Sequence, residues 1–210
     1  MDFRVEDITQ EEIDRRLAVV EPLTDAVRDL VDAVIRSTVD DEALSAARGR
    51  IEEVTATLRT QQREGSFGTP FTPEFVGMPW GNAVVGARNA LAPPLRIDQE
   101  AGGIAHCRMT LGAAYEGPGG CVHGGVAAML LDQLCGEAAA VEGVPSFTGT
   151  LTVKYLHPLP LNAPLRGRAE VTRREGRKTF VGATLADADG VAVQAEAIMI
   201  APRGFELPTE

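Results

Sequence analysis

The feature that most restricts the fold is an apolar run at residues 126–140. Only Asp132, Gln133 and Glu137 carry polar side chains in this run. A helix of this composition is apolar around most of its surface and must be largely buried. A carboxylate in such a helix costs free energy unless it is paired or used. The run therefore predicts a central helix for a domain, and it makes Asp132 a candidate for chemistry.

A glycine-rich loop comes directly before this helix, with the sequence GPGGCVHGG at residues 117–125. The first N–H groups of a helix form an electropositive site, and glycines let a substrate oxygen come close to them. An oxyanion site together with a carboxylate base suggests acyl-transfer chemistry. A phosphate-binding loop of the P-loop kind is disfavoured, since no Gly-Lys-Ser or Gly-Lys-Thr follows.

The composition excludes several classes of protein. With 210 residues, 44% of them hydrophobic, the chain can form one domain plus an extension. Its formal net charge of -10 argues against a nucleic-acid partner. The cysteines Cys107, Cys121 and Cys135 lack CxxC or zinc-like spacing, so we expect buried thiols of an intracellular protein and no bound metal. We find no signal segment and no run long enough to span a membrane, and expect a soluble cytoplasmic protein without a membrane partner.

The first part of the chain, residues 1–64, is predicted to be a helical extension. It holds 16 acids and 9 bases, a net charge of -7, so most of the acidity of the chain lies here. A capping box at Thr9 predicts a short first helix, Pro22 suits the first turn of a second, and Asp40 or Asp41 can cap a third. We interpret the extension as a solvated helical hairpin that packs on the main domain or on a partner subunit.

A loop rich in glycine and proline follows at residues 65–95 and is predicted to cross to a main domain at 96–210. Four aromatic side chains are candidates to anchor this loop: Phe67, Phe71, Phe75 and Trp80.

After the loop, the hydrophobic period changes to two residues, which predicts β-strands. The predicted strands cover residues 104–111, 150–155, 165–173, 179–186 and 191–200, with 95–98 as a weaker candidate. Residues 174–177 and 187–190 have the composition of hairpin turns. The predicted order along the chain is two strands, one long helix and then four strands. This order is best accommodated by an α+β fold in which an antiparallel sheet wraps around the helix.

With this order and these motifs, the chain resembles hotdog-fold thioesterases of the PaaI-like or 4-hydroxybenzoyl-CoA thioesterase superfamily, over roughly residues 80–202. Three stretches carry the resemblance: HGG at 123–125 with an acid nine positions after the histidine, FTGTLTVKY at 147–155, and EGRKTF at 175–180. The resemblance implies a hotdog fold with an N-terminal extension outside the shared pattern. It also implies thioester hydrolysis.

The resemblance assigns roles to the catalytic candidates. The acid matching Asp132 acts as nucleophile or as general base for water, and the N–H matching Gly124 polarises the thioester carbonyl. The threonine matching Thr148 helps hold the water or the substrate. His123 either takes part in the chemistry or caps the helix and braces the loop. Some of these enzymes also place an Asn or Gln in the loop before HGG, and this chain has neither.

Each candidate also has a structural interpretation. Asp132 can be a core acid paired with a basic group, but no basic residue lies within one helical turn of it. Thr148 can be an ordinary residue at the start of a strand. His106 and His157 have no partner pattern, and we interpret both as structural.

The spacing of the two main candidates has a consequence for assembly. Gly124 and Asp132 lie eight residues apart on one helix, which is about 12 Å along its axis. Gly124 and Asp132 of the same chain are therefore too far apart to reach one substrate carbonyl together. We therefore expect a two-fold dimer, or a dimer of dimers, in which the helix start of one subunit lies beside Asp132 of the other.

A basic segment suggests where a phosphate-bearing coenzyme binds. Residues 151–181 hold seven bases and two acids, a net charge of +5, in a chain of net charge -10. In the enzymes that the chain resembles, the segments matching 154–156 and 177–182 contact coenzyme A. A solvated strand face is the alternative. The predicted substrate-binding residues are Gly125, Lys154, Tyr155, Leu156, Arg177, Lys178, Thr179, Phe180 and Val181.

The leading functional hypothesis is therefore hydrolysis of acyl-CoA thioesters, with no cofactor because coenzyme A is part of the substrate. One alternative acts on acyl or polyketide chains carried by a protein. Another binds acyl-CoA without turnover, because the fold alone does not name a reaction. The sequence does not show which acyl group is accepted.

Overall fold

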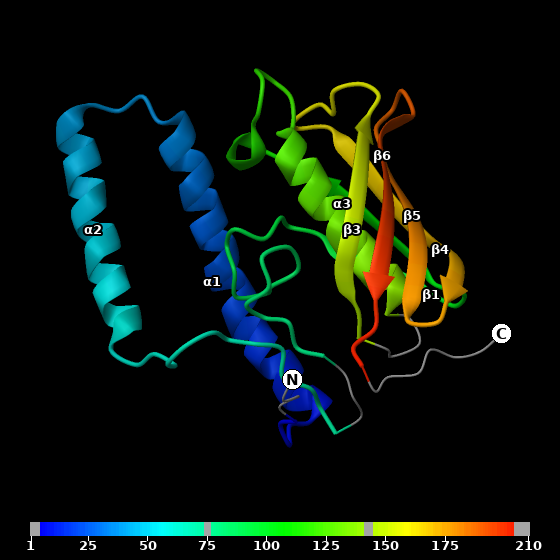
Figure 1. The fold of residues 1–210 in the computed structure, drawn as a ribbon. Helices are drawn as coiled ribbons and strands as arrows, with labels where there is room; N and C mark the ends of the chain where they lie inside the picture. Colours follow the sequence, from blue (N-terminus) through cyan, green and yellow to red (C-terminus); the bar gives the residue numbers. More distant parts are fainter. Residues whose placement is uncertain (1–4, 74–76, 141–144, 204–210) are drawn as a thin grey trace. The chain divides into compact units, whose positions relative to one another are not determined.

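The computed structural model describes residues 5–73, 77–140 and 145–203. The chain divides into two compact units, Met1–Ala90 and Leu91–Glu210. The first unit contains two helices, and the second contains a sheet and a third long helix (Figure 1). In the described residues, no helix combines the length and the apolar character needed to cross a membrane.

The helices of the first unit are α1 (Gln10–Arg36) and α2 (Asp41–Arg59). As predicted, Thr9 and Asp40 cap them by accepting a hydrogen bond from the backbone N–H of the third residue of each helix. The prediction that Pro22 begins a separate helix was wrong, because α1 continues through it. Proline removes one backbone hydrogen bond, but α1 is anchored on both sides of it, by buried Ile13 and by Thr24, whose hydroxyl donates to the carbonyl of Ala87 at 2.8 Å.

The segment after α2 folds onto α1 rather than running freely. Met78 and Trp80 are buried with Ile8 and Ile13 in a small core, and Phe67 packs against it. The rings of Phe67 and Trp80 have centroids 6.0 Å apart. Two of the four predicted aromatic anchors thus lie in this core. Phe71 forms isolated bridges at the edge of the same segment, and Phe75 lies outside the described residues.

The two helices of the first unit expose much of their apolar sequence. α2 has no buried residue. The exposed apolar side chains of α2 are Leu44, Ile51, Val54 and Leu58, and those of α1 include Val19, Leu23, Leu30 and Val34. These apolar side chains are open to solvent in the single chain.

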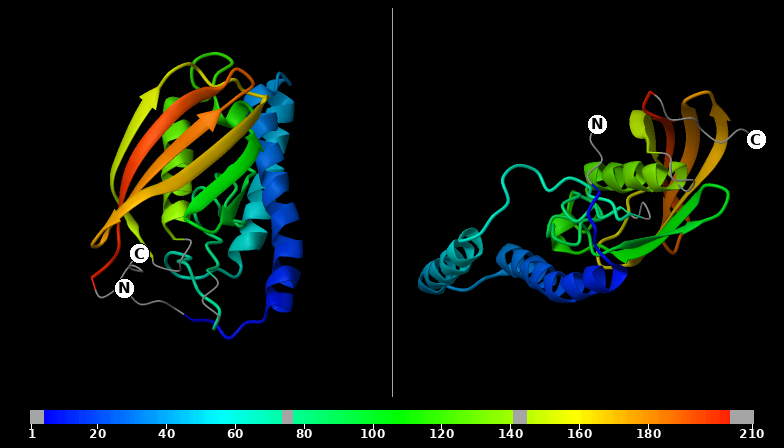
Figure 2. Two further views of the ribbon diagram at one scale, coloured as in Figure 1. Left: turned by 90° about the vertical axis from the view of Figure 1, so that its right-hand side faces the viewer. Right: turned by 90° about the horizontal axis from the view of Figure 1, so that it is seen from below.

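The second unit confirms the predicted α+β architecture, with an antiparallel sheet of six strands curved around α3 (Gly124–Ala139; Figure 2). Its strand order is β1-β2-β4-β5-β6-β3. The bounds are β1 Arg96–Glu100, β2 Ile104–Thr110, β3 Phe147–Tyr155, β4 Pro164–Glu175, β5 Lys178–Ala186 and β6 Val191–Ile200, with a short 3-10 helix at Ala113–Tyr115.

The core of this unit lies between the sheet and one side of α3. Alternate residues of β2, β4, β5 and β6 face the helix and are buried, as expected for strands with one covered face. Gly167 of β4 allows a close approach, since a Cβ there would lie 2.7 Å from Leu134 Cδ1 and 2.8 Å from Cys107 Sγ. Burial of α3 is less complete than predicted, because the sheet covers one side and leaves Met129, Asp132 and their neighbours half-buried.

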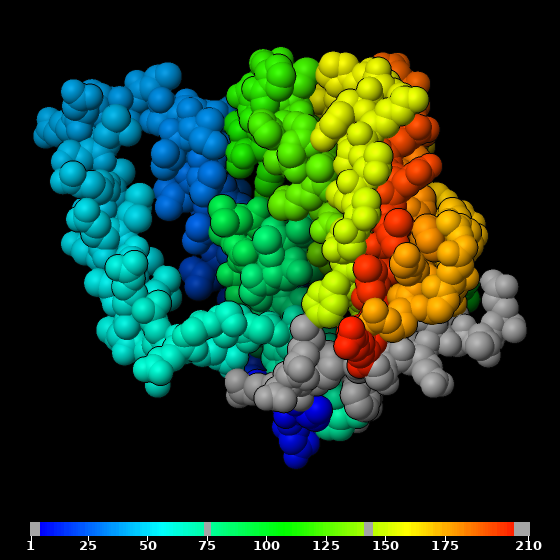
Figure 3. Space-filling view, in the orientation of Figure 1, coloured from blue at the N-terminus to red at the C-terminus, as the bar shows by residue number. Residues whose placement is uncertain are grey.

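One edge of the sheet is open. β3 pairs with β6 on one side, and its other side has no strand partner among the described residues. Most residues of β3 are exposed, including Phe147 and Tyr155 at its two ends. In Figure 3, β3 and α3 lie side by side at the surface. An exposed strand edge of this length is a template for pairing with another chain.

Candidate active site

The start of α3 leaves one backbone donor unused. His123 is the N-cap, and its Nδ1 accepts a hydrogen bond from the N–H of Gly125 at 3.0 Å. The His123 carbonyl accepts from the N–H groups of Val126 and Ala127. Within the part of the chain that the structure describes, the N–H of Gly124 has no hydrogen-bond partner. It is therefore available to an oxygen atom of a ligand at the positive end of the helix.

The glycine-rich loop holds this helix start in place. The N–H of His123 donates to the carbonyl of Tyr115, and the N–H of Gly120 donates to the Glu116 carboxylate at 3.0 Å. Gly120 has a φ of 75°, which disfavours other residues. Gly117 lies so close to the helix cap that a Cβ would be 2.7 Å from the Cα of His123. The glycines thus shape the loop around the cap as well as giving access to it.

Tyr155, at the end of β3, covers the helix start. Its hydroxyl donates to the carbonyl oxygen of Gly124 at 2.8 Å. A pocket of about 370 Å³ opens here, and its walls include Cys121, Gly124, Tyr155, Leu156 and His157. The structure thus brings together two predicted substrate-binding residues, Tyr155 and Leu156, and the predicted oxyanion donor.

Asp132 lies two turns further along α3, where β3 begins. The hydroxyl of Thr148 donates to Asp132 Oδ1 at 2.7 Å. A bulge at Gly149 interrupts the pairing of β3 with β6 directly after Thr148. The pKa of the Cys135 thiol is raised to about 12, mainly by burial and to a smaller extent by the nearby charge of Asp132. The carboxylate therefore has one orienting donor on β3 and remains half-buried at the open side of the helix.

The structure separates the two halves of the predicted site within one chain. Gly124 begins α3 and Asp132 is its ninth residue, which places them about 12 Å apart along the axis. The helix start lies next to Tyr155, whereas Asp132 lies next to Thr148 at the opposite end of β3.

Most of the predicted coenzyme-binding residues, those at 177–181, lie at the Asp132 end of the sheet. Thr179 and Thr148, which bonds Asp132, pair with Met199 of β6 from its two sides and so lie at the same level of the sheet. Arg177 donates to the backbone carbonyl of Ala201 at 3.0 Å. The side chains of Thr179 and Val181 are buried against the helix, while Lys178 is exposed. Phe180 faces outward, with the guanidinium of Arg173 3.5 Å from its ring centroid.

The remaining candidates lie elsewhere. Lys154 is exposed on β3 close to Tyr155, and Gly125 is exposed beside the helix start. His106 bonds Glu100 across the hairpin at 2.8 Å on the exposed face. Cys107 and Cys135 are buried, as expected, but Cys121 is only half-buried in the wall of the pocket, because the sheet does not cover the loop.

Sequence reasoning missed the partner of His157. Its Nε2 lies 3.3 Å from a carboxylate oxygen of Asp187, whose side chain is only 6% exposed. Burial acts to raise the pKa of Asp187, but the N–H of Asp189 and the imidazole of His157 outweigh it and hold this pKa below its ordinary value. The segment 187–190 suggested only a turn from sequence, and its pairing with residue 157 has no local signature. The described residues contain no group of three or more His, Cys, Asp or Glu side chains suited to a metal.

Comparison with known proteins gives a consistent set of similarities. The family model described as thioesterase superfamily matches residues 119–194. The acyl-coenzyme A thioesterase THEM4 of Mus musculus is 35% identical over 86 residues, which are 41% of this chain and 37% of that protein. THEM4 of Xenopus laevis is 33% identical over 91 residues, which are 43% of this chain and 41% of that protein. The chain thus spans less than half the length of these curated relatives.

A solved structure matches over a greater length. The crystal structure of a thioesterase superfamily protein superposes with a TM-score of 0.77 and 31% identity, covering 86% of this chain and 90% of the other. The likeness therefore extends beyond the second unit into the N-terminal part of the chain.

Proposed function

Because the chain belongs to the thioesterase superfamily, as its 31% identity to a solved member over 90% of that protein shows, we propose that it hydrolyses acyl-CoA thioesters to a free acid and coenzyme A. Its fold is the predicted hotdog fold. The observation that carries the proposal is the unused N–H of Gly124 at the start of the same helix that presents Asp132. The names of the mouse and frog relatives support coenzyme A as the carrier of the acyl group.

In this proposal, the thioester carbonyl oxygen accepts a hydrogen bond from Gly124, and the end of the helix stabilises the negative charge of the tetrahedral intermediate. Asp132 takes a proton from a water molecule whose oxygen attacks the carbonyl carbon. The C–S bond then breaks, and the thiolate receives the proton from Asp132, so the products are a carboxylic acid and a thiol. Thr148 holds the carboxylate for this step. A direct attack by Asp132 is the alternative, and no bound cofactor is required by either route.

The proposal requires a second subunit. Asp132 is too far along α3 to reach the carbonyl bound at Gly124 of its own chain. The unpaired edge of β3 and the half-buried side of α3 are adjacent and suit a two-fold interface. Such an interface can place the helix start of each subunit beside the partner's Asp132, giving two equivalent sites.

A pair of substitutions at Gly124 tests the oxyanion donor. Gly124→Pro removes the N–H and adds the pyrrolidine ring, and proline suits the first position of a helix after a residue with extended backbone, as His123 has here. Gly124→Ala is the matched control, since it keeps the N–H and its Cβ would meet Tyr155 at ordinary contact distances of 3.4–3.5 Å. We expect about 10²-fold slower turnover in the proline variant only. Equal activity in the two folded variants would remove Gly124 from the mechanism.

Subunit mixing tests the composite site. If Gly124→Pro and Asp132→Asn each inactivate a different half of the site, exchange of their subunits should restore one working site per heterodimer. The readout is the release of free thiol from acyl-CoA. Measuring it with short, medium, long and aromatic acyl groups also identifies the acyl preference. Heterodimers that stay inactive would refute the shared site.

A further inference from the structure

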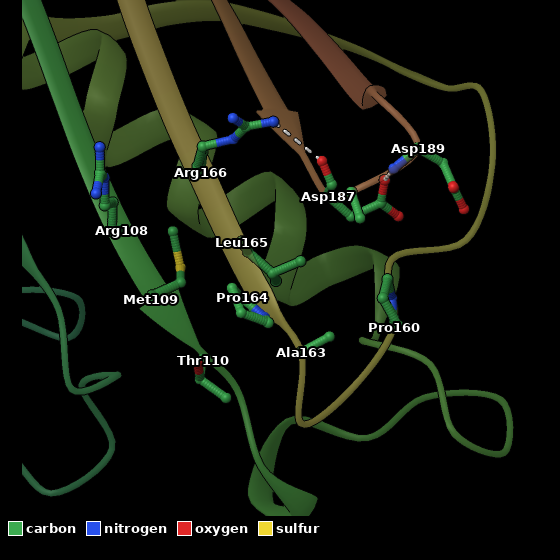
Figure 4. Close-up of a pocket in the computed structure, with 11 residues that line it drawn as sticks. Arg108, Met109, Thr110, Pro160, Ala163, Pro164, Leu165, Arg166, Asp187 and Asp189 are labelled. Carbon is green, nitrogen blue, oxygen red and sulfur yellow. Dashed lines mark hydrogen bonds between the residues drawn. The ribbon is translucent and has the colours of Figure 1, made fainter.

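A second cavity lies on the outer face of the sheet, and we propose that it binds the phosphate groups of coenzyme A through Arg108 and Arg166. This inference rests on the proposed function and adds a binding site to it. The cavity has a volume of about 780 Å³ and lies between the ends of β2 and β4 and the turn from β5 to β6 (Figure 4).

The first argument is a pair of like charges. Arg108 of β2 pairs with Arg166 of β4. Side chains at paired positions of adjacent strands share a face, with Cβ atoms about 5 Å apart, and like charges placed in this way repel each other. Such a pair is costly unless an anion neutralises it, and a phosphate with several oxygens can bond more than one guanidinium.

The second argument is the lack of an internal anion. Across residues 5–73, 77–140 and 145–203, Arg108 forms no hydrogen bond or ion pair, and the hydrogen bond of Arg166 goes to the backbone carbonyl of Asp187 at 3.2 Å. Further along the same strand, Arg168 and Arg173 each pair with a glutamate two residues away. Arg168 and Arg173 thus have carboxylate partners, whereas neither Arg108 nor Arg166 forms an ion pair within the described residues.

The third argument concerns the acids in the cavity wall. Asp187 and Asp189 lie across the cavity from Arg108 in Figure 4. The Asp187 carboxylate is buried and already accepts from His157 and from the N–H of Asp189. Asp189 is exposed at the rim. The side lined by Arg108 and Arg166 is thus open to a ligand, with the hydroxyl-bearing Thr110 beside it.

The fourth argument is the position relative to the proposed active site. One continuous segment lines both cavities, with Tyr155 to Leu159 facing the Gly124 pocket and Pro160 and Ala163 to Arg166 bordering the arginine cavity. The His157–Asp187 pair joins the two walls. A thioester bound at Gly124 can therefore extend its coenzyme toward Arg108 and Arg166 of the same chain. Arg177 and Lys178 of the same chain lie at the opposite end of the sheet, beyond Thr148, so within one chain they are not the basic residues next to the Gly124 pocket.

The test compares two substrates that carry one acyl group, acyl-CoA and the acyl thioester of pantetheine, which lacks the nucleotide. Arg108→Gln is the first variant because that side chain forms no hydrogen bond or ion pair within the described residues. We expect a rise of about tenfold in KM for acyl-CoA, and less than about twofold for the pantetheine thioester. Arg108→Gln with Arg166→Gln should enlarge the difference. Arg168→Gln, on the same strand and face but paired with Glu170, is the control and should change neither KM.

Two further measurements separate the possible failures. Calorimetric titration of the full chain with free coenzyme A reads the site without turnover: weaker binding in Arg108→Gln supports the site even if no thioester is hydrolysed. Adenosine 3′,5′-bisphosphate should compete with acyl-CoA in the wild type and lose potency in Arg108→Gln. Inhibition that does not compete with acyl-CoA would instead indicate a site for a separate organic phosphate and overturn our assignment. Equal KM changes on both substrates, or none on either, would also overturn it.

Discussion

The hydrogen bond between Thr148 and Asp132 offers the sharpest quantitative test of the proposed chemistry. Asp132→Asn keeps the size of the side chain and removes the proton acceptor, so turnover should fall at least about 10²-fold. Thr148→Val keeps the shape of the threonine and removes one hydrogen bond of 2.7 Å to a carboxylate. Such a bond contributes roughly 1.5–3 kcal/mol when shielded. Because the pair is partly solvated in the single chain, we expect about 1–1.5 kcal/mol, or about a five- to tenfold loss of kcat/KM.

The double variant decides whether the threonine acts through the acid. If Thr148 only orients Asp132, adding Thr148→Val to Asp132→Asn should cause almost no further loss of kcat/KM. The double variant should then be as active as Asp132→Asn alone, so the losses of the two single variants would not add. Thr148→Ser, which keeps the hydroxyl, is the control and should retain most of the activity.

The assay is release of thiol from one acyl-CoA, with thermal unfolding used to verify that each variant remains folded. Wild-type turnover in folded Asp132→Asn would refute the role of the acid. Fully additive losses in the double variant would show that Thr148 contacts water or substrate independently of Asp132.

Three other predictions concern stability and reactivity. Gly167→Ala should lower the free energy of unfolding by about 1–3 kcal/mol in urea titration, since its Cβ overpacks the core, whereas Gly182→Ala, with its nearest contact at 3.7 Å, should not. The depressed pKa of Asp187 means that its carboxylate stabilises the fold above the ordinary pKa of 3.8 and loses this contribution as the pH falls through the lowered pKa. Asp187→Asn should therefore lose less stability than the wild type as the pH falls below 3.8, and an unchanged acid profile would contradict the assignment. Burial raises the pKa of Cys107 to about 11 and that of Cys135 to about 12. A thiol reagent at a pH of about 8 should therefore modify Cys121 first, and rapid modification of all three cysteines in the native protein would count against the buried positions.

Patterns that repeat over a few residues were enough to predict most of the elements. The apolar run that begins after His123 predicted α3, and the period of two residues predicted the strands, because helix and strand periodicity depend on which face of a local segment is covered. The turns at 174–177 and 187–190 likewise follow from local backbone preference. The separation of Gly124 from Asp132 follows from helix geometry alone.

Only the tertiary structure decided the features that depend on distant segments. α1 continues through Pro22 because Thr24 is held by a residue 63 positions away. The bond of His157 to Asp187 spans 30 positions, and the pairing of Arg108 with Arg166 depends on the register of β2 against β4. A shift of that register by one residue would put the arginines on opposite faces. No local pattern in the sequence carries this register, since it is set by how the whole sheet packs its inward residues against α3.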